Sequence, residues 1–263
     1  MSETNRRALL REATASWPAG TVGERRPVVL VHGFVDTGET PWWRRLERHL
    51  RTDSYRDADV HPVSLGDRLG QANDSPRTYA ADIEAALESV YDERGCPGDV
   101  VAHSMGGLGA RWALEERGAA PYVRNLVTLG TPHQGTRAAH LIAPTAGGRD
   151  MVPGSEFLGA LNDGPTAPGV RYTAVWGALD AAVVGRRRAE LPAAVRGEGD
   201  ENRPAGRRTH LQLVFDDDVY RTYRDRLQGP ARQCSDKGLK TPESPRHARL
   251  PGLAVVRESD ALS

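Results

Sequence analysis

The stretch that most constrains the fold is residues 100–107, which read Val-Val-Ala-His-Ser-Met-Gly-Gly. Its β-branched residues predict the end of a strand, and the small residues after Ser104 lead into a helical pattern. A serine on a sharp strand-to-helix turn exposes its hydroxyl at a sheet edge, where strand and helix must cross very closely. Ala102 and Gly106 are small enough for that crossing. The alternative interpretation is a glycine-rich turn with an incidental serine.

Strand and helix patterns alternate around this turn. Strands are expected at residues 27–31, 99–103, 123–129 and 171–176. Helices are expected from Pro41 after Thr40, from Pro76 after Ser75, from Met105 and after Asp216, with apolar stripes such as Trp42, Leu46 and Leu50. Continuous apolar strands are typical of parallel sheets covered on both faces. The pattern therefore predicts an α/β fold, a mostly parallel central sheet with helices on both faces.

The charge balance and the cysteines exclude several function classes. Lys+Arg and Asp+Glu both number 35 in the 263 residues, so no long-range field would attract nucleic acid. No apolar run approaches the 18 residues of a transmembrane segment. Cys96 and Cys234 match no metal spacing and are weak evidence for a disulfide. We expect no metal and no cofactor.

The chain divides into three parts. Residues 25–228 form the predicted domain, with a loop or cap insertion at about 133–170 and an exposed loop at 186–209. Residues 1–24 are expected to be an arm on the domain. We expect a cytoplasmic location, and the Arg6-Arg7 pair leaves export by the twin-arginine route as the alternative. Residues 229–263 are expected to be a mobile tail, although 250–256 could form a strand.

Nucleophilic catalysis by a serine needs a base within hydrogen-bond reach and a carboxylate that orients the base. Ser104, Asp180 and His210 follow one another in the order expected for a serine on such a turn, and all three are expected at the carboxyl edge of the sheet. Asp163 lies in an Asp-Gly-Pro turn before the strand 171–176, which argues against it. Among the other histidines, His133 is the alternative base.

Two further sets of residues complete the predicted site. Backbone amides are rigid donors for an oxyanion, and those of Met105 and Phe34 are the expected pair. In the insertion, the apolar residues Phe157, Leu158 and Leu161 either form a wall of an acyl-binding site or fill the core beneath the loop.

Several stretches between residues 27 and 227 resemble small bacterial or archaeal lipases of the α/β-hydrolase fold. They are V-H-G-F at 31–34, A-H-S-M-G-G at 102–107, T-L-G-T-P-H-Q-G at 128–135, G-A-L-D at 177–180 and H-L-Q-L-V at 210–214. The polar segment 202–209, with its proline and glycine, departs from the strand that usually precedes the histidine in these lipases, so any strand here is expected to be short or irregular.

The resemblance implies a serine esterase or lipase that forms an acyl-enzyme on a lipid or acylglycerol ester, a small-molecule substrate. A thioesterase, a phospholipase or a non-catalytic binding protein on the same scaffold are the alternatives. Acyl-chain length and oligomeric state stay open.

Overall fold

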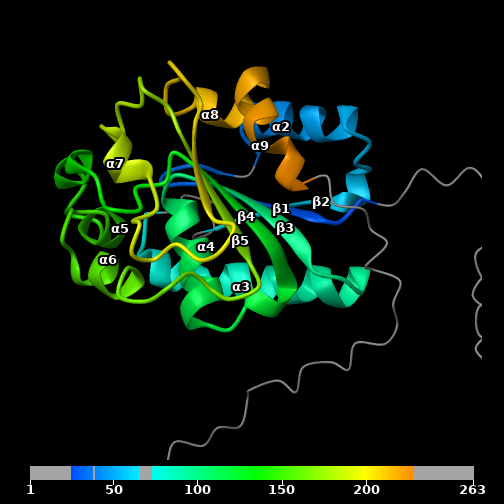
Figure 1. The fold of residues 1–263 in the computed structure, drawn as a ribbon, viewed down its shortest axis with the longest axis horizontal. Helices are drawn as coiled ribbons and strands as arrows, with labels where there is room; N and C mark the ends of the chain where they lie inside the picture. Colours follow the sequence, from blue (N-terminus) through cyan, green and yellow to red (C-terminus); the bar gives the residue numbers. More distant parts are fainter. Residues whose placement is uncertain (1–24, 38, 66–72, 228–263) are drawn as a thin grey trace, which may run out of the picture.

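A computed structural model of the chain describes residues 25–37, 39–65 and 73–227. Within these residues, six strands form a single parallel sheet in the order β2-β1-β3-β4-β5-β6 (Figure 1). Their bounds are Val28–Val31 for β1, Val60–Val63 for β2, Gly98–His103 for β3, Val123–Leu129 for β4, Arg171–Trp176 for β5 and Glu201–Pro204 for β6. The predicted parallel α/β sheet is confirmed.

Helices cover both faces of this sheet (Figure 1). Helices α2 (Pro41–Thr52), α8 (Gln212–Phe215) and α9 (Asp217–Leu227) pack on one face, and α3 (Pro76–Arg94) and α4 (Met105–Glu116) pack on the other. Strand β1 alternates between the two: Val28 and Leu30 join the core under α2, whereas Val29 and Val31 join the core under α3. Burial on both faces explains its continuous apolar run.

The helix-start signals act as expected at α3 and α9. The Ser75 hydroxyl accepts the amide of Arg77 at 3.1 Å, and α3 ends on Gly95 in the left-handed region. Asp216 accepts the amide of Asp218 at the start of α9.

Helix α2 departs from prediction in two ways. Thr40 precedes it without a side-chain capping bond, because its hydroxyl donates to Asp36 instead, at 3.1 Å. The buried face carries Trp43 with Leu46 and Leu50, whereas Trp42 is only half-buried. Both indole N–H groups donate to the same carboxylate of Asp36, at 3.1 Å and 2.9 Å. This shared acceptor lies before the helix, so the apolar spacing within α2 does not reveal it.

The regions where the sequence predicted no strand or helix contain short strands and helices. Strand β2 is four residues long, includes Pro62 and lies at the sheet edge, where a proline is tolerated. The predicted loop 186–209 contains α7 (Arg186–Ala189) and strand β6, which pairs with β5. The insertion 133–170 contains α5 (Ala146–Asp150) and α6 (Glu156–Leu161), and 3₁₀ turns lie at Asp57–Asp59, Ala120–Tyr122 and Arg137–Leu141.

Some predictions fall on residues that the structure does not describe. The N-terminal arm 1–24, the tail 229–263 and Cys234 lie outside the described residues, while Cys96 is buried and is not a free thiol. In the described part of the chain, no helix combines the length and the apolar character needed to cross a membrane. The same part holds no cluster of His, Cys, Asp and Glu suited to a metal ion.

Candidate active site

Ser104 lies on a strained turn between β3 and α4. Its φ of 55° and ψ of −128° form a conformation that a non-glycine residue adopts at a cost of about 1–3 kcal/mol. The turn is held on both sides, because the Ser104 amide donates to the Leu129 carbonyl at 2.9 Å and the Ser104 carbonyl accepts from Gly107 at 3.1 Å. A Cβ atom on Gly106 would lie 2.2 Å from the His32 carbonyl oxygen. The start of α4 therefore lies very close to the end of β1, where only a residue as small as Gly106 fits.

Ser104, His210 and Asp180 form a continuous hydrogen-bonded chain. The Nε2 atom of His210 lies 2.9 Å from the Ser104 Oγ atom, and its Nδ1 atom lies 2.8 Å from Asp180 Oδ2. Because a carboxylate only accepts, Nδ1 carries the hydrogen and Nε2 is left to face the serine. The structure thus brings together the three residues predicted from their order in the sequence.

The loop after β5 fixes the carboxylate of Asp180. Its second oxygen, Oδ1, accepts the backbone amides of Ala182 at 2.9 Å and Val183 at 2.8 Å. Gly130, which follows β4, has a φ of +58°, and a Cβ atom there would lie 2.9 Å from Asp180 Oδ2 and 3.0 Å from His210 Nδ1. A glycine is therefore required where the carboxylate meets the imidazole. Asp163 is exposed and lies in the insertion, before β5.

His103 supports His210 directly, a role that the sequence did not reveal. Its Nε2 atom donates to the backbone carbonyl of His210 at 3.2 Å, and the two rings lie 4.5 Å apart. Burial, followed by the neighbouring His210, holds the pKa of His103 well below its usual value. His103 is therefore neutral at pH 7 and acts as a hydrogen-bond donor. The position of His103 directly before Ser104 was the sequence signal that could have indicated this role.

Two other histidines have structural partners. His32 accepts the Leu65 amide on Nε2 at 2.8 Å, so its Nδ1 donates to the Gly33 carbonyl at 3.2 Å and braces the loop after β1. His133, the alternative base, is fully buried and bonds to the Thr128 hydroxyl at 2.9 Å rather than to the serine.

The loop that carries Phe34 is clamped by Asp36. Its Oδ1 atom accepts the amide of Thr37 at 2.7 Å as well as the Thr40 hydroxyl, while Oδ2 accepts both indoles of α2. Val35, which lies between Phe34 and Asp36, has a φ of 53°, and this is unusual for a β-branched residue. Gly33 lets this loop approach the nucleophile, because a Cβ atom there would lie 2.8 Å from the Ser104 Cβ atom. Met105 begins α4, where amides lack an intrahelical acceptor.

The insertion packs into the core through the residues considered for an acyl wall. Phe157, Leu158 and Leu161 are all at most 3% exposed and belong to the core cluster on the α3 and α4 face. Side chains so fully enclosed by protein fill the core, which supports the second of the two predicted alternatives. Arg111 of α4, also buried, holds this segment by donating to the Leu161 carbonyl at 2.9 Å and to Asn162 Oδ1 at 3.0 Å, and its charge is paired with Glu115 of the same helix.

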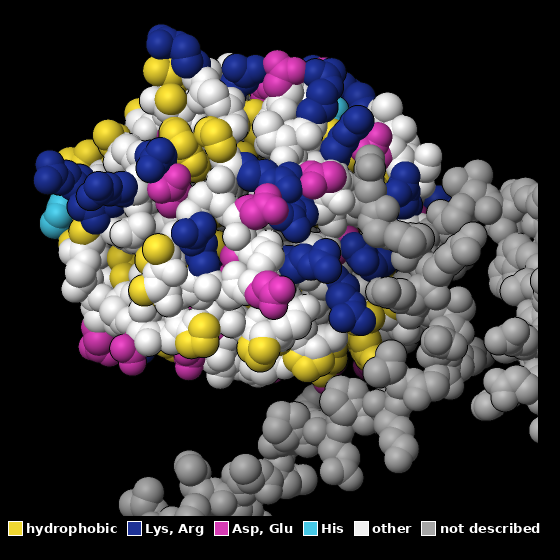
Figure 2. All heavy atoms as spheres, in the orientation of Figure 1, with side chains coloured by type: hydrophobic (Ala, Val, Ile, Leu, Met, Phe, Trp, Pro, Cys, Tyr) yellow, Lys and Arg dark blue, Asp and Glu magenta, His cyan; other side chains and the backbone are white. Residues whose placement is uncertain are grey.

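Exposed apolar side chains lie beside the hydrogen-bonded chain. The large hydrophobic residues that stay exposed in the described part of the chain are Val35, Leu141, Leu179, Val184 and Leu211. Three of them directly neighbour Phe34, Asp180 and His210 in the sequence. Figure 2 shows hydrophobic side chains interspersed with arginines on the side of the molecule that carries α7. The edge that presents the serine is thus partly apolar.

Comparisons with known proteins agree with this architecture. The mature lipase BlEst2 of Bacillus licheniformis superposes with a TM-score of 0.62 at 18% identity, covering 81% of this chain and 96% of that one. Lipase B of Aspergillus fumigatus superposes with a TM-score of 0.59 at 19% identity, covering 82% of this chain and 56% of the lipase. At such identities, the likeness shows the α/β-hydrolase fold.

Sequence comparison identifies the family. A palmitoyl-protein thioesterase-dolichyl pyrophosphate phosphatase fusion protein of Schizosaccharomyces pombe is 30% identical over 128 residues, which make up 46% of this chain and 20% of that protein. The family model for palmitoyl protein thioesterase matches residues 27–167, more than half of the chain. The chain therefore belongs to the palmitoyl protein thioesterase family and has the α/β-hydrolase fold.

Proposed function

We propose that this enzyme hydrolyses long-chain acyl esters, with a preference for thioesters, through an acyl-enzyme on Ser104. The observation that carries the proposal is the chain of hydrogen bonds from Ser104 Oγ to His210 at 2.9 Å and from His210 to Asp180 at 2.8 Å. A hydroxyl is a weak nucleophile at neutral pH, and this arrangement supplies the base and the orienting carboxylate that activate it.

The chemistry proceeds in two halves. The Ser104 Oγ atom attacks the acyl carbonyl carbon while His210 Nε2 takes its proton, and Asp180 stabilises the resulting imidazolium. His210 then returns the proton to the leaving thiol or alcohol as its bond to the carbonyl carbon breaks. A water molecule, deprotonated by His210, attacks the acyl-serine and releases the fatty acid. The proton then returns to Ser104, so the enzyme is regenerated.

The tetrahedral intermediates place negative charge on the former carbonyl oxygen. We assign its stabilisation to the backbone amides of Met105 and Phe34. Met105 supplies an N–H at the start of α4, and the Asp36 clamp fixes the loop that carries Phe34. Removing one such donor typically costs about 3–4 kcal/mol of transition-state stabilisation.

One feature favours an acyl chain in the substrate, and another favours a thioester link. The exposed apolar residues Val35, Leu179 and Leu211 flank the assigned groups, so a hydrocarbon chain would meet apolar surface beside the serine. The matched family model is described as a palmitoyl protein thioesterase. The candidate triad itself would serve oxygen esters as well, because the attack on the carbonyl carbon is the same in both.

A matched pair of substrates tests the proposal. The enzyme is assayed on a palmitoyl thioester and on the corresponding oxygen ester, each at two acyl lengths. We expect a higher kcat/KM on the thioester and on the longer chain. A preference for the oxygen ester would leave a lipase or esterase, and a preference for short chains would remove the lipid assignment.

The nucleophile is tested with Ser104→Ala. This change deletes one oxygen at a half-buried site, so the fold should persist while kcat falls by several orders of magnitude. A serine-reactive fluorophosphonate should label the wild type and not the variant. Near-normal turnover by a folded variant would refute the mechanism, and an inactive wild type on every ester would favour the non-catalytic binding protein.

A further inference from the structure

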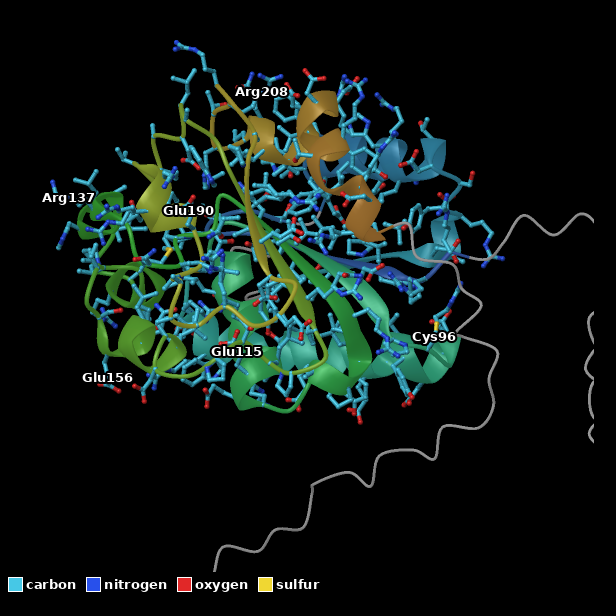
Figure 3. The ribbon with its side chains drawn as sticks, in the orientation of Figure 1. Cys96, Glu115, Arg137, Glu156, Glu190 and Arg208 are labelled. Carbon is cyan, nitrogen blue, oxygen red and sulfur yellow. The ribbon has the colours of Figure 1, made fainter. Side chains whose placement is uncertain are left out.

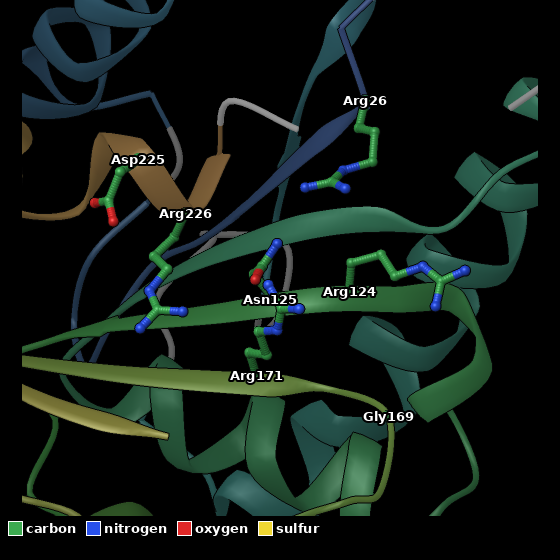
Figure 4. Close-up of a pocket in the computed structure, with 7 residues that line it drawn as sticks. All are labelled: Arg26, Arg124, Asn125, Gly169, Arg171, Asp225 and Arg226. Carbon is green, nitrogen blue, oxygen red and sulfur yellow. The ribbon is translucent and has the colours of Figure 1, made fainter. Parts of the chain in front are cut away.

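The described residues form a pocket at the opposite end of the sheet from Ser104. Its volume is about 460 Å³, and arginines dominate its lining (Figure 4). Arg26 precedes β1, Arg124 and Arg171 stand at the starts of β4 and β5, and Arg226 comes from the last turn of α9. Parallel strands begin at one edge and end at the other. Strand β3, six residues long, therefore separates this pocket from the nucleophile by roughly 20 Å.

The positive charge of this pocket is only partly neutralised. Arg26 is paired with the buried Asp99 at 3.1 Å, and Arg226 is paired with Glu201. Among the described residues, neither Arg124 nor Arg171 has an acidic group within salt-bridge distance. Both residues line the pocket, and Arg171 is the one whose unpaired guanidinium extends toward its centre (Figure 4).

The acid that lines the pocket does not cancel this excess. Both carboxylate oxygens of Asp225 accept from Arg203, at 2.6 Å and 3.0 Å, so its charge is already used by an arginine that does not line the pocket. A concave site with charges of one sign concentrates its field and attracts counter-ions of the other sign.

Two of the four arginines are held in place before a ligand arrives, whereas Arg124 and Arg171 are exposed. Arg26 is 9% exposed, and the Arg226 side chain is 12% exposed. The Nε atom of Arg226 is buried and has no hydrogen-bond partner, which is costly unless an acceptor fills the site. Figure 4 shows Arg26 and Arg171 extending toward Asn125, with Arg226 beside them and Arg124 pointing away along β4. Groups fixed in this way lose little entropy on binding.

From this arrangement we propose that the pocket binds a small, soluble organic phosphate. Guanidinium groups present paired donors that match phosphate oxygens, and the volume exceeds that of a simple ion. None of the exposed large hydrophobic residues lines the pocket, which argues for a free phosphate compound over a lipid headgroup. The site is separate from the proposed acyl-ester chemistry and does not depend on it.

Calorimetric titration of the full chain with glycerol 3-phosphate tests this proposal, with glycerol as the uncharged control. We expect saturable binding of the phosphate, competition by inorganic phosphate, and no binding of glycerol. Arg171→Gln should raise the dissociation constant about tenfold or more, since a hydrogen bond between charged partners is lost. The dissociation constant of Arg171→Lys should lie between those of the wild type and Arg171→Gln, because lysine keeps the charge but lacks the paired donors of the guanidinium group.

Arg137→Gln is the matched control. It removes the same charge from an exposed arginine with no acidic partner among the described residues. Cys96 lies just before β3, at the end of the sheet where the pocket is, and Arg137 lies at the far end of the molecule from Cys96 (Figure 3). Its dissociation constant should stay within about twofold of the wild type. Arg171→Lys replaces Arg171→Gln if that variant fails to fold. Absence of saturable binding, an equal loss in Arg137→Gln, or binding only to phosphatidic acid vesicles would overturn the proposal.

Discussion

The residue before the candidate nucleophile holds the candidate base: His103 Nε2 donates to the backbone carbonyl of His210 at 3.2 Å. Strand β3 therefore positions two members of the hydrogen-bonded chain, one through the turn at Ser104 and one through this bond. Because His103 is fully enclosed and neutral, its contribution is geometric.

We predict that His103→Ala lowers kcat by about 100-fold while KM changes little, because a displacement of about 1 Å in a catalytic group has an effect of that size. His103→Gln should recover part of the activity, since its amide can donate to the same carbonyl. Steady-state kinetics on one ester substrate provides the comparison. An unchanged kcat in folded His103→Ala would show that His210 needs no such support.

The orienting carboxylate is tested by a pair of variants. Asp180→Asn should lower kcat by about 10⁴-fold, because the amide favours the wrong tautomer of His210. Asp163→Asn should be nearly normal, since Asp163 is exposed and lies before β5. Measuring both kcat values side by side decides the matter, and the assignment fails if Asp163→Asn is the impaired variant.

Gly130 is the glycine that we expect to be indispensable for the site. In Gly130→Ala the new methyl group would meet Asp180 and His210 at about 3 Å on a backbone with φ of +58°, so activity should be largely lost. The control is Gly159→Ala in α6, where a Cβ atom would have no neighbour within 4 Å. That variant should be active and about 0.5–1 kcal/mol more stable, as for other helical glycines. Equal activity of the two would contradict the packing argument.

The sequence predicted the sheet core because its signals are local, and it predicted that Ser104, Asp180 and His210 would lie together. The apolar run of β1, the turn at Ser104 and the caps at Ser75 and Asp216 each depend on neighbours in the chain. The order of Ser104, Asp180 and His210 was sufficient to select them once a parallel sheet was expected, because strand ends meet at one edge.

What the sequence did not predict depends on contacts between distant segments. Strands β2 and β6 are four residues long and lie at the sheet edges, so pairing rather than periodicity defines them. Trp43 rather than Trp42 packs into the core on the α2 face, and both indoles donate to Asp36, which lies before the helix. Phe157 gives the same apolar pattern whether it faces substrate or core, and only packing against α4 separates the two.

The buried titratable groups predict how stability depends on pH. Burial lowers the pKa of His103 and His133 well below 6.5, and it lowers those of His32 and His61 as well. A histidine with a depressed folded-state pKa contributes stability above its unfolded pKa, and this is lost as the pH falls. The unfolded chain therefore takes up protons below pH 6.5 that the folded protein does not bind.

Asp99 acts in the opposite direction. Burial raises its pKa from 3.8 to about 6, so near pH 5 the folded protein binds one proton that the unfolded chain does not. His103 and His133 together outweigh it, and the free energy of unfolding should fall by about 1.4 kcal/mol per pH unit near pH 5. Urea unfolding at pH 7, 6 and 5 measures this slope. His133→Gln should reduce the slope by about one proton, and Asp99→Asn should steepen it by about one. A flat profile, or the same slope in both variants, would show that these groups titrate alike in the folded and unfolded chains.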